Sequence, residues 1–292
     1  MVRARARGEA ATRVTPERWR QARAAVRDAG ERFAALVESA PDPAARAVGR
    51  WSVADTAAHV TAIALNNTAV VAGGTKPFPI PEVRPHLPAT TLATLSGGMN
   101  AVQLDAFAER DPERLAARLR EAVAEVLATT EHADPTTVLP WLGGSRLPLA
   151  GLLAHLSNEL LVHGWDIARA SGVPWELPEE QAALFLDLFL VELTRHGHGR
   201  LLDDYPDPPR PIAVGFHSTR TEPVTMVLGA GVARVEEGGG PCDVHLRFRP
   251  SALNLVVFHR IGRARAALTG GLLVWGRRPW LLEPFLRKVR MP

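Results

Sequence analysis

The chain has 292 residues, 46% hydrophobic and 22% charged, which is typical of a globular protein that buries a substantial core. Its 34 basic and 31 acidic side chains are interleaved and leave a formal charge of only +3, which argues against a nucleic-acid partner. The single cysteine, Cys242, excludes an intrachain disulfide and a cysteine-based zinc knuckle. Because the basic N-terminus lacks a following apolar segment, and the uncharged residues 56–75 include His59, Asn66 and Asn67, we expect a cytoplasmic protein without a membrane span.

The first two thirds of the sequence predict helices. Thr15, followed directly by a proline and a glutamate, is a helix start signal. Ser52 and Asp55, three residues apart, form a box-like cap for a second helix, which should end before a Gly-Gly pair. Apolar residues recur at helical spacing between the glycine and proline breaks. We expect helices over residues 15–38, 52–71, 90–110, 112–132, 147–171 and 178–198.

A proline-rich loop, residues 77–88, separates the second and third helices and shows no helix or strand pattern. Long irregular loops often cover a functional site, although an ordinary surface crossing is the alternative interpretation. Arg84 and His86 are its candidate ligand-facing side chains. We assign Arg84 to an acidic substrate or cosubstrate, because a guanidinium group can hold a carboxylate through two hydrogen bonds.

The composition changes after residue 199, and a linker-like run over residues 205–211 precedes segments that alternate with a period of two. These segments predict an antiparallel sheet, with residues 229–231 as a hairpin turn. The C-terminal third therefore reads as a small α+β domain behind an all-helical domain. We expect strands over residues 211–217, 223–228, 232–236, 242–248 and 272–275, and helices over residues 250–258, 264–269 and 279–289.

The helix expected from residue 147 carries ionisable side chains on an otherwise apolar face. Glu159 and His163 are four residues apart and therefore project from one face, one turn from each other. His155 lies one turn earlier on the same stripe. A carboxylate and an imidazole are costly to bury unpaired, so they must satisfy each other or bind something that satisfies both, such as a divalent metal.

His59, near the apolar side of the second helix, completes a possible metal site with Glu159 and His163. Two imidazoles and a carboxylate on facing helices suit a divalent ion such as zinc and leave one coordination position open. Taken singly, each residue is more often a satisfied core or surface group, and Glu-x-x-x-His is common in helices. His155 is a fourth ligand, a partner of a ligand or merely exposed, and Asp166 either orients His163 or holds the helix end.

Two segments resemble a known family. Residues 51–59, WSVADTAAH, resemble the W-S-x-x-(D/E)-x-x-x-H segment of the DinB-like metalloenzymes. Residues 159–166, ELLVHGWD, resemble the E-x-x-x-H-x-x-D segment of the mycothiol-dependent maleylpyruvate isomerases, and the interval between the segments also suits that family. Residues 262–289 are similar to the end of its sterol-carrier-protein-like domain, although the run VWGRRP lacks an acidic residue after glycine, which argues against a lipid-carrier role.

The resemblance implies an N-terminal DinB-like four-helix bundle over residues 13–200 and a smaller sterol-carrier-protein-like α+β domain over residues 211–292. It implies that His59, Glu159 and His163 bind zinc or a similar ion, and that mycothiol or another low-molecular-weight thiol is the cosubstrate. The metal-activated thiolate would attack a small electrophilic substrate, in an isomerase or a transferase reaction. Arg84, Asp166 and His155 are the candidate catalytic residues, and we expect a monomer or homodimer.

Two other functions stay open at this point. A metal-dependent hydrolase on the same scaffold would hold water at the open position, where zinc lowers its pKa towards about 7. It would need a general base, for which His155 or Asp166 is available, and it would turn over without added thiol. A non-catalytic small-molecule-binding or regulatory protein would lack bound metal, and the intact set of three candidate ligands argues against it.

Overall fold

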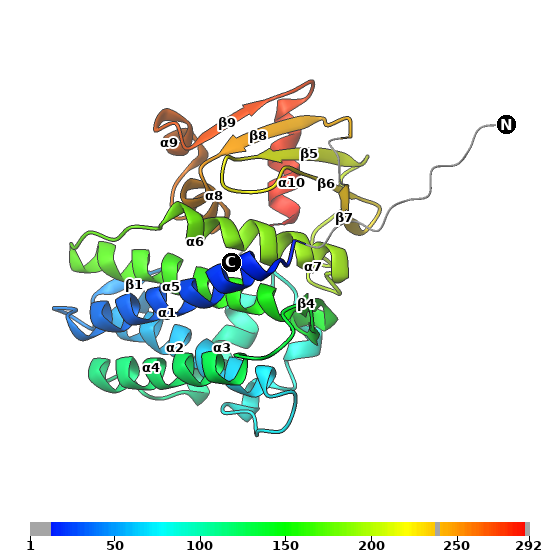
Figure 1. Ribbon diagram of the computed structural model, residues 1–292. Coiled ribbons are helices and arrows are strands. Elements are labelled where there is room, and N and C mark those ends of the chain that lie inside the picture. Colours follow the sequence, from blue (N-terminus) through cyan, green and yellow to red (C-terminus); the bar gives the residue numbers. More distant parts are fainter. Residues whose placement is uncertain (1–12, 237–239, 290–292) are drawn as a thin grey trace.

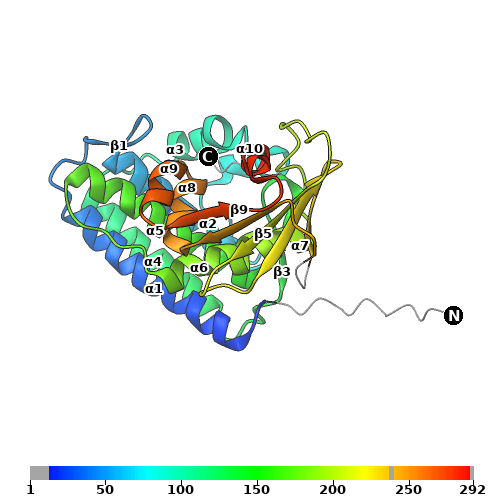
Figure 2. The ribbon, with the colours of Figure 1, turned by 90° about the horizontal axis from the view of Figure 1, so that it is seen from above.

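A computed structural model of the chain describes residues 13–236 and 240–289, so the basic N-terminus considered above lies outside the described residues (Figure 1). Helices fill the N-terminal region, and the C-terminal region contains a five-stranded sheet with helices beside it. In Figure 1 the sheet stands above the helical region, and Figure 2 shows the same arrangement from above. The predicted order, helical region first and sheet region second, is confirmed. None of the described helices is long and apolar enough to span a membrane.

Four long helices in the described residues form the N-terminal core. α1 and α2 each pack against both α4 and α5. The predicted caps are present: the Thr15 hydroxyl accepts a hydrogen bond from the Arg18 amide, and Ser52 and Asp55 bond each other's backbone reciprocally. α5 ends where Gly172 adopts a φ of 69°, which glycine tolerates best. The four helices are α1 (Pro16–Glu38), α2 (Val53–Val71), α4 (Pro112–Thr129) and α5 (Leu149–Ser171).

Two predicted helices contain π-helical turns. The helix expected over residues 90–110 is wrong at both ends, because residues 90–94 and 107–110 are not helical. The helix begins with a π segment, Leu95–Met99, that leads into α3 (Asn100–Ala106). The pair Gly97-Gly98 within this segment weakens a regular α-helical ladder. The helix expected over residues 178–198 is interrupted in the same way, as α6 (Glu179–Leu184), a π segment (Phe185–Leu190) and α7 (Val191–His196).

Short irregular elements complete the helical region. The proline-rich loop over residues 77–88 contains two 3₁₀ turns, Pro81–Val83 and Leu87–Ala89. Two small hairpins were not predicted, and they place Trp51 at the entrance to α2 and Trp141 between two strands. They consist of β1 (Arg46–Val48) with β2 (Trp51–Ser52), and β3 (Val138–Pro140) with β4 (Arg146–Pro148).

The five-stranded sheet has the order β7-β6-β5-β8-β9 and is mixed. β5 and β8 pair in parallel, so the expected antiparallel sheet is wrong at its centre. The reason is topological: β8 pairs with β5 and not with the strand before it, so no hairpin turn fixes its direction. The elements of this region are β5 (Ile212–His217), β6 (Val224–Gly229), β7 (Val232–Glu236), β8 (Val244–Phe248), α8 (Pro250–Val257), α9 (Arg263–Leu268), β9 (Leu272–Trp275) and α10 (Leu282–Lys288).

Polar contacts tie the two regions together. α6 packs on α8, and α7 packs on β7. The Glu179 carboxylate accepts hydrogen bonds from the Ser251 amide at 2.9 Å and from its hydroxyl at 2.7 Å, and so caps α8 from outside that helix. Asn254 on α8 donates to Asn158 on α5 at 2.9 Å. The sheet region is therefore anchored directly on the helix that carries Glu159 and His163.

Candidate metal centre and its cavity

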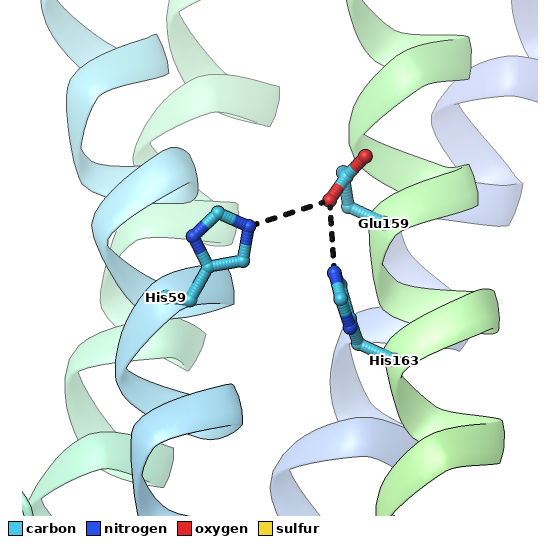
Figure 3. Close-up of side chains that lie close together, drawn as sticks. All are labelled: His59, Glu159 and His163. Atoms are coloured by element: carbon cyan, nitrogen blue, oxygen red, sulfur yellow. Dashed lines mark ion pairs between the residues drawn. The ribbon is translucent and has the colours of Figure 1, made fainter. Parts of the chain in front are cut away.

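His59 of α2 meets Glu159 and His163 of α5 in the interior of the helical region (Figure 3). Nε2 of His59 lies 3.8 Å from Oε2 of Glu159, and Nε2 of His163 lies 3.4 Å from the same oxygen. One potential ligand atom from each of the three residues lies within 4.8 Å of the other two. All three side chains are buried. The structure thus brings together the three residues that the sequence suggested as metal ligands.

The outer nitrogen of each imidazole has a partner of its own. Nδ1 of His59 lies 3.1 Å from Oε1 of Gln103, and Nδ1 of His163 lies 3.0 Å from Oδ2 of Asp166. With a cation bound between the rings and Glu159, a proton on each Nδ1 would satisfy these contacts and leave both Nε2 lone pairs free for the ion. Metal-bound histidines are usually held by such an outer hydrogen bond. The donor set of two imidazole nitrogens and one carboxylate oxygen fits a divalent ion such as zinc.

The electrostatics of the cluster follow from burial and from its own charges. Burial lowers the pKa of His59, which favours its neutral form. Burial alone would raise the pKa of Glu159, but hydrogen bonds from His163 and His59 outweigh it and hold that pKa well below its ordinary value. Burial likewise opposes protonation of His163, but the carboxylates of Asp166 and Glu159 outweigh it and raise its pKa. Cation binding must therefore compete with a proton on His163.

Asp166 connects the cluster to the C-terminal region. Its carboxylate accepts from Nη2 of Arg260 at 2.8 Å and from Nε at 3.1 Å, and Arg260 also donates to the Phe258 carbonyl. Asp166 contacts His163 and also joins a polar network near the end of α5, so its contacts are compatible with both sequence interpretations. Arg260 was missed by sequence reasoning, since no local pattern links it to a residue on α5.

His155 lies on the other side of Glu159. Its Nε2 is 3.4 Å from Oε1, the carboxylate oxygen that does not face His59 and His163. The ring is wedged between Trp141 and Phe189, with centroid distances of 5.0 Å to each, and burial lowers its pKa. Its Nδ1 is buried without a hydrogen-bond partner among the described residues. The interpretation of His155 as merely exposed is therefore wrong.

The cluster lines a cavity of about 1140 Å³. Among the described lining residues Glu159 is the only acidic one, whereas Arg50, Lys76, Arg84 and Arg260 are all basic. Lys76 pairs with a glutamate on α4, whereas Arg84 is exposed at the wall of the cavity. Because Arg260 in turn pairs with Asp166, the attraction of the cavity for anions rests on Arg50 and Arg84. Arg84 therefore lies at the cavity wall, as the sequence suggested, although it does not contact the cluster among the described interactions, and His86 is not part of the described wall.

Two asparagines on the His59 face of α2 were also missed. Asn66 and Asn67 lie seven and eight residues after His59, which places them on the same helix face, and both line the cavity. They are 8% and 7% exposed, and Oδ1 of Asn66 and Nδ2 of Asn67 have no partner among the described residues. Buried polar atoms are normally bonded, so these two point to a polar ligand. The signal was available in the sequence: adjacent asparagines inside an apolar helix.

The fold and the cluster define a helical protein with a candidate divalent-metal centre, joined to a mixed-sheet region that supplies part of the wall. The family model described as the mycothiol maleylpyruvate isomerase N-terminal domain matches residues 22–168, which is half of the chain and includes all three candidate ligands. The chain belongs to this family. The family predicted from the sequence is thus confirmed, and it is a family of enzymes.

One solved structure shows the same fold, and a second is similar to a lesser degree. A structure of a histidine-to-alanine mutant of the mycothiol-dependent maleylpyruvate isomerase is 14% identical, with a TM-score of 0.52, and covers 91% of this chain and 95% of that chain. A second structure of the mycothiol-dependent maleylpyruvate isomerase is 15% identical with a TM-score of 0.49 over the same shares. No curated protein matches the chain. The first likeness covers both the helical region and the sheet region.

Proposed function

We propose that the protein is a metal-dependent enzyme that uses mycothiol or another low-molecular-weight thiol to isomerise a small anionic electrophile, or to transfer the thiol to it. The observation that carries the proposal is the convergence of two buried imidazoles on Glu159 at the wall of a basic cavity. Membership of the isomerase family supports the thiol-dependent reaction.

His59, Glu159 and His163 would hold the ion, with Gln103 and Asp166 fixing the two rings. When bound, a divalent ion lowers the pKa of a coordinated thiol, so that thiolate is available at neutral pH. Asp166 acts as a positioning residue, because it bonds the outer nitrogen of His163 and does not belong to the described lining of the cavity. This assignment replaces the catalytic role considered for Asp166 from the sequence.

The reaction proceeds by addition and elimination. The thiolate sulfur forms a bond to an electrophilic carbon of a double bond conjugated to a carbonyl group, and the π electrons move to the carbonyl oxygen. Rotation about the resulting single bond, followed by return of the electrons and loss of the thiolate, gives the trans isomer. If another group leaves from the attacked carbon, the same addition gives S-transfer.

Other cavity residues supply binding and proton transfer. Arg84 binds a substrate carboxylate, and Asn66 and Asn67 bind polar groups of the substrate or the thiol. His155 is half-buried, its lowered pKa favours the neutral ring, and its Nδ1 has no partner among the described residues, so it can accept the thiol proton. The same property would let His155 serve as general base in the alternative hydrolase, whose turnover would need no thiol.

Metal analysis of the wild type, His59→Ala and His163→Ala tests the proposal, together with turnover in the presence and absence of mycothiol. We expect both variants to lose bound zinc and thiol-dependent turnover, whereas His86→Ala, on the exposed loop outside the cavity wall, keeps both. Full metal content in both variants would refute the metal centre, and equal turnover without thiol would establish the hydrolase instead.

Several finer expectations stay predictions. They are the DinB-type four-helix bundle as a domain over residues 13–200, the sterol-carrier-protein-like domain over residues 211–292, the choice of zinc, a cytoplasmic location, the absence of a nucleic-acid partner, and a monomeric or homodimeric state. Sedimentation of the purified chain measures the last of these directly.

A further inference from the structure

A second cavity, of about 120 Å³, lies between the helical region and the sheet region. Its wall comes from α5, the π segment Phe185–Leu190, α7, the sheet, α8 and α10, and it is almost entirely apolar. Protein interiors rarely leave voids larger than a water molecule, and an apolar cavity of about 150 Å³ stays dry and binds benzene. This space is therefore suited to an apolar group and unsuited to water.

The small cavity adjoins the candidate metal centre. Six residues line both cavities, and two of them, His155 and Glu159, belong to the ionisable stripe of α5. The two cavities are therefore adjacent at the Glu159 carboxylate, and a ligand held at the metal centre would lie next to the apolar space. The other four shared residues are Leu95, Trp141, Leu142 and Phe258.

Irregular helix geometry contributes to the wall of the small cavity. Phe185 and Phe189 belong to the π segment of the helix that carries them, and their rings stack at 5.1 Å on the wall of the apolar cavity. Leu95, which lines both cavities, begins the other π segment among the described residues. π turns are rare and recur at functional sites, and here one lines the small cavity while the other begins at a residue that lines both cavities.

We propose that the electrophile carries an apolar group about the size of a six-membered ring, and that this group occupies the small cavity while its anionic end faces the basic wall of the large one. The inference rests on the proposed function. It assigns the substrate class as an amphipathic carboxylic acid with a ring or a short alkyl chain. Each methylene buried in the cavity should raise kcat/KM about fourfold until the space is full.

Filling the cavity from the sheet side tests the inference. Ala233 on β7 lines the small cavity, so Ala233→Phe should occupy it. Val232, the preceding residue of the same strand, is 52% exposed and lines neither cavity, so Val232→Phe is the matched control. Val257→Phe, on α8 and also in the wall, fills the same space if Ala233→Phe fails to fold.

Toluene is the binding probe, measured by calorimetry on the full chain, because it needs neither metal nor thiol. We expect the wild type and Val232→Phe to bind toluene, and the filled variant to bind it at least about tenfold more weakly. No binding by the wild type, or equal binding by all variants, would overturn the inference.

A kinetic series separates this inference from the proposed function. Unsaturated carboxylic acids bearing hydrogen, methyl, propyl or phenyl at the carbon next to the attacked one are compared with metal and mycothiol present. We expect kcat/KM to rise along the series for the wild type and to stay flat for the filled variant. If kcat/KM does not depend on the substituent, the apolar subsite alone is refuted. If the protein binds toluene but turns over none of these acids, the proposed reaction is refuted and the subsite stands.

Discussion

Replacing Asp166 by asparagine probes whether His163 is held ready for a cation. Asp166 is 1% exposed. Its carboxylate accepts a hydrogen bond from Nδ1 of His163 at 3.0 Å and another from Nη2 of Arg260 at 2.8 Å. Asparagine keeps the shape of the side chain but removes its charge, and so weakens both hydrogen bonds. The imidazole becomes a poorer donor of its Nε2 lone pair and is less firmly oriented.

Two independent estimates give the size of the effect. A hydrogen bond to a charged group contributes about 1.5–3 kcal/mol. Loss of the outer partner of a metal-binding histidine typically weakens metal affinity by about 10–100-fold, which equals about 1.4–2.7 kcal/mol. The two ranges overlap, so we expect the zinc dissociation constant of Asp166→Asn to rise by about 10–100-fold.

The assay is competition between the demetallated full-length chain and a chromophoric zinc chelator. Asp187→Asn is the matched control, because Asp187 is also 1% exposed and pairs with Arg13 at 2.6 Å and with Arg18 at 2.8 Å, with no histidine among its partners in the described part of the chain. The control should lose stability but keep its zinc affinity. Wild-type zinc affinity in Asp166→Asn, or an equal loss in both variants, would refute the positioning role.

Three further outcomes follow from the same geometry. Arg84→Ala should raise the KM for an anionic substrate at least about tenfold and leave kcat unchanged, which steady-state kinetics measures. Burial alone would raise the pKa of Glu179, but hydrogen bonds from the Ser251 amide and hydroxyl outweigh it and lower that pKa. Glu179→Gln should therefore destabilise the protein at pH values above about 4.3, the pKa of a glutamate in the unfolded chain. In urea unfolding, the difference in stability between the wild type and the variant should vanish as the pH falls through the lower pKa of Glu179 in the folded protein. Gly164→Ala should lower the free energy of unfolding by about 1–3 kcal/mol, because a Cβ there would lie 2.2 Å from Cζ2 of Trp175. Urea unfolding measures this change, and an unchanged free energy would show that the Trp175 indole moves freely.

Local signals predicted most of the helical region correctly. Thr15, Ser52 and Asp55 act on backbone groups within three residues of themselves, so the caps they form can be inferred without any tertiary information. The meeting of His59 with the Glu159 stripe was also predictable, because helical periodicity places both on apolar faces that must be buried. Periodicity alone could not show that the two apolar faces meet, so the joint site was a hypothesis from the residues that the family resemblance supported.

Tertiary packing decided what the sequence missed. Gln103 and Arg260 each form a hydrogen bond with a residue far away in the chain. No rule of sequence spacing predicts such long-range contacts. The π segments have nearly the same apolar pattern as an α-helix, so an extra residue in the turn leaves no clear trace in the sequence. The parallel pairing of β5 and β8 depends on where the chain returns to the sheet, and β-propensity contains no information on that choice.

Charge balance offers a reason for pairing this cluster with an anionic cosubstrate. Asp166 and Arg260 form a buried pair whose charges cancel, which leaves Glu159 as the one uncompensated acid beside the two histidines. With a divalent cation bound and both rings neutral, the buried group would keep one net positive charge, which is costly in a poorly solvated interior. A thiolate removes that charge, whereas a neutral thiol or water does not. The arrangement therefore favours the deprotonated cosubstrate, and the basic residues farther along the cavity wall stay available for the substrate carboxylate.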